Sequence, residues 1–230
     1  MECEYVLELK SVSKAYTKGG IQTHALRNIS LGVNRGEFVS ITGPSGSGKS
    51  TLLNVIGLLD DYGDGEYFLK QRMVSQLSNK EKAFARNACF GFVFQSFNLI
   101  ESLSIAENVA LPMLYLDGGV DSKFLDRRVR EVLELVGISS CATFKPSEIS
   151  GGQQQRAAIA RALVNKPDVI LADEPTGNLD SVNGKSILDL LKSLNESGTS
   201  ICMVTHDLKF AGIADRNIRI SDVMISSAEV

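Results

Sequence analysis

A short glycine-rich segment carries the clearest chemical signal in the sequence. Its residues, Gly43–Ser50, read GPSGSGKS and match the pattern G-x-x-x-x-G-K-[ST] of phosphate-binding loops. The glycines let backbone N–H groups turn inward around phosphate oxygens. Lys49 offers a cation to the β- and γ-phosphates, and the Ser50 hydroxyl offers an oxygen ligand to Mg²⁺. The residues predicted here to bind a nucleotide are Gly43, Pro44, Ser45, Gly46, Ser47, Gly48, Lys49, Ser50 and Thr51.

The segments on both sides of this loop are those that a phosphate site needs. The apolar run Phe38–Ile41 predicts a strand before it, and Ser50–Leu59 carries apolar residues at helical spacing after it. A helix that begins near Ser50 points its positive end at the same anion. An ordinary glycine-rich turn with a surface lysine is the alternative, and the strand–loop–helix context disfavours it.

A second chemical signal follows another buried strand. The unbroken apolar run Val169–Ala172 is typical of a strand that is covered on both faces of a parallel sheet. Asp173 comes next and is predicted to hold Mg²⁺, while Glu174 is predicted to orient and deprotonate water beside the γ-phosphate. Taken alone, an acidic pair at a strand end is usually a solvated cap, but the phosphate loop upstream favours the catalytic interpretation.

One apparent motif has a different explanation. The segment Asn165–Asp168 resembles the guanine-reading N-K-x-D motif of GTPases. In those proteins the motif follows a strand that lies downstream of the Mg²⁺ aspartate, whereas here it precedes the strand that ends at Asp173. We therefore interpret it as a turn that leads into the sheet.

The other segments predict an alternation of strands and helices. Ser104 and Glu107 have the spacing of a capping box and predict a helix start. The further predicted strands are Tyr5–Tyr16, Ala25–Val33, Gly63–Gln71, Phe90–Phe94 and Ser200–Thr205, and the further predicted helices are Ile105–Tyr115, Asp121–Val136, Ser150–Val164 and Ser181–Leu194.

Composition narrows the class of protein. The 230 residues fit one α/β domain, and 43% hydrophobic residues are enough for a sizeable core. A net charge of -3 argues against nucleic acid as a partner. The cysteines are far apart in the chain and form no metal-ligand pattern. Neither a signal peptide nor an apolar run of membrane-spanning length is present, so we expect a soluble protein whose membrane role, if any, runs through a partner.

A third segment opens the helix predicted at Ser150–Val164. Ser150, Gly151, Gly152 and Gln153 expose backbone N–H groups at a helix start, where an anion can approach closely. An ordinary serine N-cap would explain the same residues. Together with the phosphate loop and the acidic strand end, however, the segment resembles the LSGGQ signature of ABC ATPases, with Ile149 in place of leucine. The resemblance extends over essentially the whole chain.

The resemblance implies roles for residues that composition and spacing leave open. Tyr16 is similar to the aromatic residue that stacks on adenine, although a strand core would also accommodate it. Gln95 resembles the glutamine that contacts Mg²⁺ and the attacking water. Asp180 resembles the aspartate that couples two ATP sites, and His206 resembles the histidine that bonds the γ-phosphate. Ser150–Gln153 would contact the ATP of a second copy.

The resemblance also implies the fold. It is an α/β fold with a P-loop NTPase core, an antiparallel β-subdomain near the N-terminus and an α-helical subdomain inserted at about residues 96–160, all within one domain. The segments 150–156 and 174–180 are similar to those of lipoprotein-release, macrolide-export, peptide-export and cell-division ATPases. Ser221–Val223 departs from the Asp-Gly turn that is common in that group.

These observations together predict an ATPase subunit of a transport complex. We expect it to bind ATP and Mg²⁺, to form an ATP-sandwich homodimer, and to dock on an integral-membrane permease at the cytoplasmic face of the inner (cell) membrane. The expected docking surface lies beside Gln95, where Phe97, Leu99 and Ile100 are apolar. A soluble mechanical ATPase that acts on DNA or ribosomes is the rival class, and a regulatory subunit without hydrolysis is a third.

Overall fold

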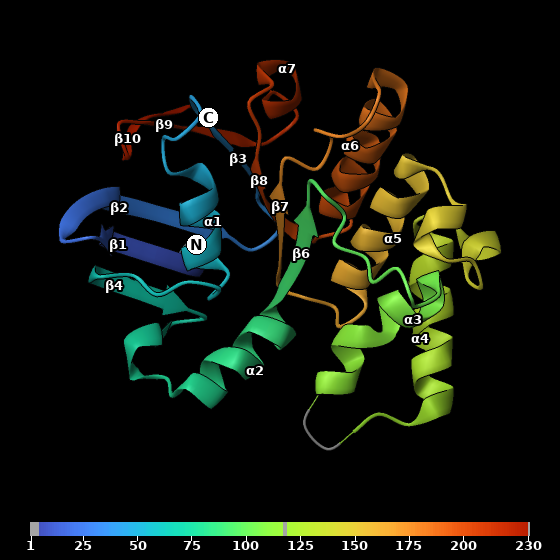
Figure 1. Cartoon of the computed structure of the whole chain (residues 1–230). Coiled ribbons are helices and arrows are strands. Elements are labelled where there is room, and N and C mark those ends of the chain that lie inside the picture. Colours follow the sequence, from blue (N-terminus) through green and yellow to red (C-terminus); the bar gives the residue numbers. More distant parts are fainter. Residues whose placement is uncertain (1–4, 117–118, 230) are drawn as a thin grey trace.

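The computed structural model describes residues 5–116 and 119–229, which build two sheets and the helices around them (Figure 1). An antiparallel sheet has the strand order β2-β1-β4-β5, and a larger sheet has the order β10-β9-β3-β8-β7-β6. The first sheet consists of β1 (Tyr5–Lys18), β2 (Ile21–Asn34), β4 (Asp64–Leu69) and β5 (Arg72–Met73). The second consists of β3 (Phe38–Thr42), β6 (Phe90–Phe94), β7 (Val169–Asp173), β8 (Ser200–Val204), β9 (Arg216–Ser221) and β10 (Met224–Glu229).

Helices connect and cover these strands. The α-helices are α1 (Lys49–Ile56), α2 (Asn79–Cys89), α3 (Ile105–Ala110), α4 (Ser122–Leu135), α5 (Gly151–Leu163), α6 (Ser181–Glu196) and α7 (Leu208–Ala211). Short 3-10 helices lie at Val74–Gln76, Leu111–Tyr115, Ser139–Cys141 and Pro146–Glu148. Helices α3, α4 and α5 are inserted between β6 and β7 and lie opposite the antiparallel sheet in Figure 1. The expected α/β class with an antiparallel sheet and inserted helices is confirmed. In the described part of the chain, no helix has the length and apolarity to cross a membrane.

The strands at the parallel centre of the larger sheet are almost completely buried. Every residue of β3 and β8 is buried, and so is every residue of β7 except its last. Strands β3 and β8, β8 and β7, and β7 and β6 pair in parallel, so their carboxyl ends point the same way. Ligands of such sheets bind outside the carboxyl ends of the strands. The loops that follow these strands therefore form one edge.

One expected helix and two expected strands differ in length from the prediction for clear physical reasons. The helix expected over Ile105–Tyr115 begins with the predicted capping box, in which Ser104 Oγ accepts from the Glu107 N–H at 3.2 Å. Its α-helical part ends at Ala110, because Pro112 has no N–H and its ring clashes with the carbonyl one turn earlier. The first two strands are longer than predicted, because Gly19 and Gly20 alone make the turn between them.

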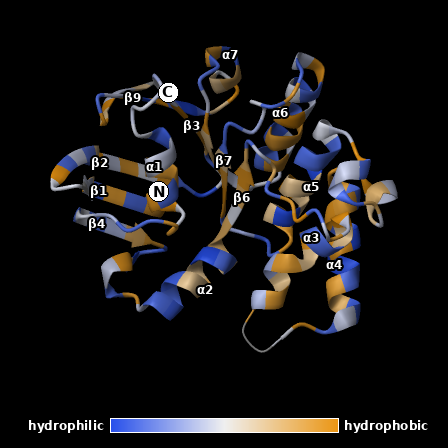
Figure 2. Cartoon of the chain, viewed as in Figure 1, coloured by the Kyte–Doolittle hydropathy of each residue, from blue (hydrophilic) through white to orange (hydrophobic). Residues whose placement is uncertain are grey.

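Helix α2 was not among the predicted helices. None of its residues is fully buried, and Figure 2 shows it as largely hydrophilic, so it carries little apolar periodicity. Its start was nevertheless encoded locally. Ser78 and Glu81 form a capping box, with Glu81 Oε2 accepting from the Ser78 N–H at 2.9 Å.

The turn that departs from the Asp-Gly pattern still makes a hairpin. Strand β10 pairs antiparallel with β9, and the intervening Asp222 and Val223 both adopt left-handed backbone angles, with φ of 49° and 61°. The Val223 carbonyl accepts a hydrogen bond from the Arg27 N–H at 2.8 Å, which ties this turn to β2. A β-branched residue in this conformation is strained.

We therefore predict that Val223→Gly stabilises the protein. Glycine adopts this backbone angle without the penalty for a side chain, so the free energy of unfolding should rise by about 1 kcal/mol. Val182→Gly, at an exposed valine in α6, should instead lower it by a similar amount. Urea denaturation of both variants and of the wild-type protein measures these changes. A Val223→Gly protein with a lower free energy of unfolding than wild type would contradict the prediction.

Candidate functional site

The phosphate loop follows β3 directly, and its glycines are fixed by close neighbours. A Cβ atom on Gly43 would lie 2.1 Å from the Ile220 carbonyl oxygen, and one on Gly48 would lie 2.4 Å from the Ala25 carbonyl oxygen. Both glycines also have positive φ angles. The loop is therefore clamped between β9 and β2, in a conformation that only glycine allows at these two positions.

Lys49 lies across the inside of this loop. Its Nζ donates to the carbonyl oxygens of Gly43 and Pro44 at 2.9 and 2.8 Å. Helix α1 begins here with Gly48 as its N-cap, no side chain caps it, and its first turn has no acidic residue. Ser47 Oγ is also buried, with no hydrogen-bond partner among the described residues. Open backbone donors, an enclosed lysine and an unpartnered hydroxyl fit the phosphates of a nucleotide.

Two oxygen donors of the predicted metal site are adjacent. Ser50 Oγ donates to Asp173 Oδ1 at 3.2 Å, so the start of α1 meets the end of β7. Burial raises the pKa of the Asp173 carboxyl, and the charge of Glu174 raises it further, while Ser50 and Lys49 act against this rise. A hydroxyl and a carboxylate are hard oxygen ligands, and Mg²⁺ commonly takes only one or two such ligands from a protein that also binds phosphates. The donor set fits Mg²⁺.

Glu174 and His206 come from neighbouring strand ends and contact each other. The Nδ1 atom of His206 lies 2.9 Å from Glu174 Oε1, and the Glu174 N–H donates to the Val204 carbonyl at 3.0 Å. Glu174 has a left-handed φ of 47°, which is uncommon for a residue other than glycine. The Glu174 side chain is mostly covered, whereas His206 is largely exposed. The imidazole thus holds the carboxylate at the mouth of the loop.

Glu174 and His206 line a cavity of about 460 Å³, whereas Asp173 is not among its described lining residues. This cavity brings together part of the phosphate loop with Glu174 and His206. Strand β2 adds Thr23, His24 and Ala25, which are not among the predicted site residues. The described lining consists of Thr23, His24, Ala25, Ser45, Gly46, Gly48, Lys49, Ser50, Thr51, Glu174, Val204 and His206.

Other predicted site residues lie outside this lining. Tyr16 is 44% exposed and pairs with Thr23 across β1 and β2, which places it next to the cavity. Gln95 follows β6 and exchanges two hydrogen bonds with Asn178: its Nε2 donates to Asn178 Oδ1 at 3.1 Å and its carbonyl accepts at 3.0 Å. Asp180 caps α6 and accepts from the Asn183 N–H at 2.9 Å.

The signature segment is also absent from the described lining. Ser150 is the N-cap of α5, with its Oγ accepting from the Gln153 N–H at 3.3 Å and Gln153 Oε1 accepting from the Ser150 N–H at 2.9 Å. Ser150 is therefore an ordinary serine N-cap of α5, as the alternative interpretation of this segment expected. A Cβ on Gly152 would lie 2.7 Å from Asn183 Oδ1, so the starts of α5 and α6 pack together. The cavity of this chain does not include the signature residues.

A larger cavity of about 630 Å³ lies between α2, β6 and the inserted helices. Its wall includes the exposed aromatic residues Phe84 and Tyr115, and its cations are Lys80, Arg86 and Arg161. No acidic residue is among the described residues of this lining. The surface is therefore aromatic and basic.

Arg161 links this larger cavity to the segment after Gln95. Its guanidinium donates to the carbonyl oxygens of Phe97 and Asn98 at 2.8 and 2.5 Å, and both of those residues have positive φ angles. Of the segment expected to form the docking surface, Asn98 lines the cavity, whereas Leu99 packs against the core of the inserted helices. The apolar character of Leu99 thus has a structural cause.

A phosphate loop between a strand and a helix, set beside an acidic strand end, defines a P-loop nucleotide-binding protein of the α/β class. Comparisons with known proteins give the family. The model of the ABC transporter family matches residues 26–177. An ATP-binding cassette whose dimeric structure was solved in a post-hydrolysis state with ADP and Pi has a TM-score of 0.89 and 44% identity, over 97% of each chain.

Curated relatives agree. An uncharacterized ABC transporter ATP-binding protein of Methanocaldococcus jannaschii is 48% identical, over 94% of this chain and 96% of that protein. The macrolide export ATP-binding/permease protein MacB of Nitrobacter winogradskyi is 46% identical over 96% of this chain, which spans about a third (34%) of that relative. The chain belongs to the ABC transporter family, and it is an ATP-binding ATPase of that family.

Proposed function

We propose that this chain powers the export or extraction of a substrate through a separate membrane permease, and that two copies close around ATP to do so. The observation that carries the proposal is that the predicted nucleotide-binding residues lie in two separate places. One cavity holds part of the phosphate loop with Glu174 and His206, while the helix start at Ser150–Gln153 lies outside it. In this proposal residues 1–230 act as one ATP-binding domain, with the helical subdomain inserted at about 96–160.

In this proposal, the phosphate loop and the residues at the strand ends have separate roles in hydrolysis. The phosphate loop and the start of α1 bind and orient the phosphates, and Lys49 neutralises their charge. Ser50, Asp173 and Gln95 would hold Mg²⁺, which spreads the negative charge of the phosphates when bound. Glu174 accepts a proton from the attacking water, and His206 keeps that carboxylate in place.

We predict that Glu174→Gln abolishes turnover and leaves ATP binding intact. The amide keeps the shape of the side chain but cannot act as a base, so steady-state hydrolysis should fall at least about 100-fold. The contacts of the phosphate loop do not involve this carboxylate. Parallel measurements of ATP affinity and hydrolysis test the assignment, with Glu134→Gln on α4 as a matched control that should behave as wild type. Turnover near the wild-type level in Glu174→Gln would refute it.

The homodimer follows from the helix start that the cavity of one chain does not use. The backbone donors and positive dipole end of α5, around Gly151, suit an anion. In a head-to-tail pair they would meet the γ-phosphate held by the other copy. Exposed Val182 and Leu208, which follow Asp180 and His206 in sequence, provide apolar surface near the same edge. The solved structure of the similar ATP-binding cassette is dimeric, which supports a dimer of this chain.

We therefore expect the Glu174→Gln protein to change from monomer to dimer when Mg-ATP is added, as measured by light scattering. Adding Gly151→Asp should prevent the change. An acidic residue suits the first turn of its own helix, where a Cβ has room, but it repels the triphosphate of the partner. A Glu174→Gln protein that stays monomeric at millimolar ATP would count against the dimer.

The larger cavity is the proposed docking site for the permease at the cytoplasmic face of the inner membrane. Its aromatic wall and its cations Lys80, Arg86 and Arg161 fit an amphipathic segment that carries an acidic residue. Arg161 also holds the carbonyls of Phe97 and Asn98, next to Gln95. A change at the nucleotide site therefore has a short covalent and hydrogen-bonded route to this surface.

We predict that Phe84→Asp releases the chain from its permease without loss of ATP binding. The substitution places a charge in the aromatic wall, where Phe84 is 47% exposed, so its fold should tolerate the change. Phe124→Asp on α4, at a phenylalanine that is 45% exposed, is the control and should still co-purify with the permease from solubilised membranes. If the wild-type chain stays in the cytosolic fraction beside its permease, the transport proposal fails and a mechanical ATPase becomes the better interpretation.

A further inference from the structure

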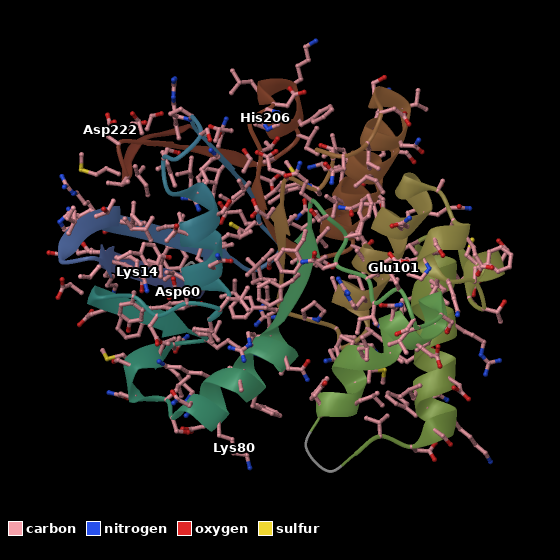
Figure 3. All side chains as sticks on the ribbon, in the orientation of Figure 1. Lys14, Asp60, Lys80, Glu101, His206 and Asp222 are labelled. Carbon is pink, nitrogen blue, oxygen red and sulfur yellow. The ribbon has the colours of Figure 1, made fainter. Side chains whose placement is uncertain are left out.

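Tyr16 is held by two side chains that are outside the nucleotide cavity. Its hydroxyl donates to Asp60 Oδ2 at 2.6 Å. The ammonium group of Lys14 lies 4.9 Å from the centre of its ring, and Lys14 Nζ also donates to Asp60 Oδ1 at 2.6 Å. Figure 3 shows Lys14 and Asp60 beside each other on the antiparallel-sheet side of the molecule. The three side chains form a closed set of contacts, which we call the Tyr16 clamp.

The clamp joins the strand that carries Tyr16 to the helix that begins at the phosphate loop. Asp60 lies just beyond the end of α1, and its N–H donates to the Asn54 carbonyl of that helix at 3.3 Å. Lys14 also donates to the Asp61 carbonyl at 2.5 Å. Side chains of Lys14 and Asp60 are mostly covered, at 13% and 29% exposure. The position of the Tyr16 ring is therefore fixed relative to α1, and through α1 to the phosphate site.

Charge states support the same contacts. Burial raises the pKa of Asp60, but hydrogen bonds from Lys14 and Tyr16 outweigh it and leave the pKa below its ordinary value. The bond to Asp60 raises the pKa of the Tyr16 hydroxyl and burial raises it further, while the Thr51 hydroxyl and the charge of Lys14 act against this rise. At neutral pH Asp60 is thus an ionised acceptor and Tyr16 a neutral donor, and both partners hold the state that the contact needs.

We propose that Asp60 and Lys14 are positioning residues for Tyr16, which they hold as a preformed platform for the base of the nucleotide. The proposal rests on the proposed function as an ATPase, and on the expectation from the family resemblance that Tyr16 stacks on adenine. Lys14 lies over the ring and Asp60 holds the hydroxyl, yet Tyr16 remains 44% exposed, so in this proposal the base stacks on the ring face away from Lys14. A side chain that is already ordered loses less conformational freedom when the base stacks on it, so affinity rises without any contact between Asp60 and the nucleotide.

The test separates the base from the phosphates. Asp60→Ala should weaken Mg-ATP binding about fivefold and leave the affinity for Mg-tripolyphosphate unchanged, as measured by calorimetry. Tyr16→Phe keeps the ring but removes the hydroxyl that donates to Asp60, so it should also weaken Mg-ATP binding. In the Tyr16→Phe background Asp60→Ala should have a smaller effect than it has alone. Asp61→Ala is the matched control, because that neighbouring carboxylate is exposed and bonds Lys82 instead. It should change neither affinity.

Each outcome bears on a different claim. Equal losses for ATP and tripolyphosphate in Asp60→Ala would show that Asp60 acts on the phosphate loop through α1, and would overturn the clamp. If Tyr16→Ala does not weaken ATP binding, the expected stacking of adenine on Tyr16 fails, while the proposed function as an ATPase stands. If Tyr16→Ala weakens ATP binding and Asp60→Ala does not, only the positioning role is lost. Unchanged tripolyphosphate binding also shows that the variants are folded.

Discussion

The parallel pairing of β3, β8, β7 and β6 is the constraint on which the rest of the structure depends. Because these strands point the same way, the residues that follow them meet at one edge of the sheet. Gly43 follows β3, Glu174 follows β7, Gln95 follows β6, and His206 lies two residues beyond β8. Residues that are far apart in the chain thereby become neighbours, and the burial of the strands keeps that edge rigid. Chemistry that rests on positioning and charge needs this rigidity.

The sequence was sufficient for the parts of the site that follow from local pattern. A strand, a glycine-rich loop and a helix predict the phosphate site, and an apolar run followed by Asp173 and Glu174 predicts the acidic edge. Long-range contacts were beyond reach. Nothing in the pattern around Asp60 shows that it meets Tyr16, since the two are joined only by the way β1 packs on the end of α1. The position of Thr23 was easier to predict, because a tight turn at Gly19 and Gly20 implies that Thr23 pairs with Tyr16.

The errors in the predicted elements have the same origin. Apolar periodicity revealed the buried strands and the helices with a buried stripe, and it failed for α2, whose contacts are made by partly exposed side chains. A long apolar pattern ran through Pro112, and there the missing N–H decided the structure rather than the periodicity. Val223 departs from the usual residue preference of a turn, because it is a β-branched residue in the left-handed backbone conformation. The hydrogen bond from the Arg27 N–H to its carbonyl helps to hold that turn.

Helix α5 connects the two surfaces through which this chain would communicate. Its first turn carries Gly151 and Gly152 and packs against the start of α6, where Asp180 is the cap. Near its other end, Arg161 donates hydrogen bonds to the carbonyls of Phe97 and Asn98, beside the aromatic and basic cavity. A helix is stiff along its axis, so a displacement at one end moves the other. A contact between the signature of one copy and the phosphates of another would thus move the segment after Gln95 in the first copy. In the proposed dimer, the ATP site of one chain and the proposed docking surface of its partner would then be coupled by a single rigid element.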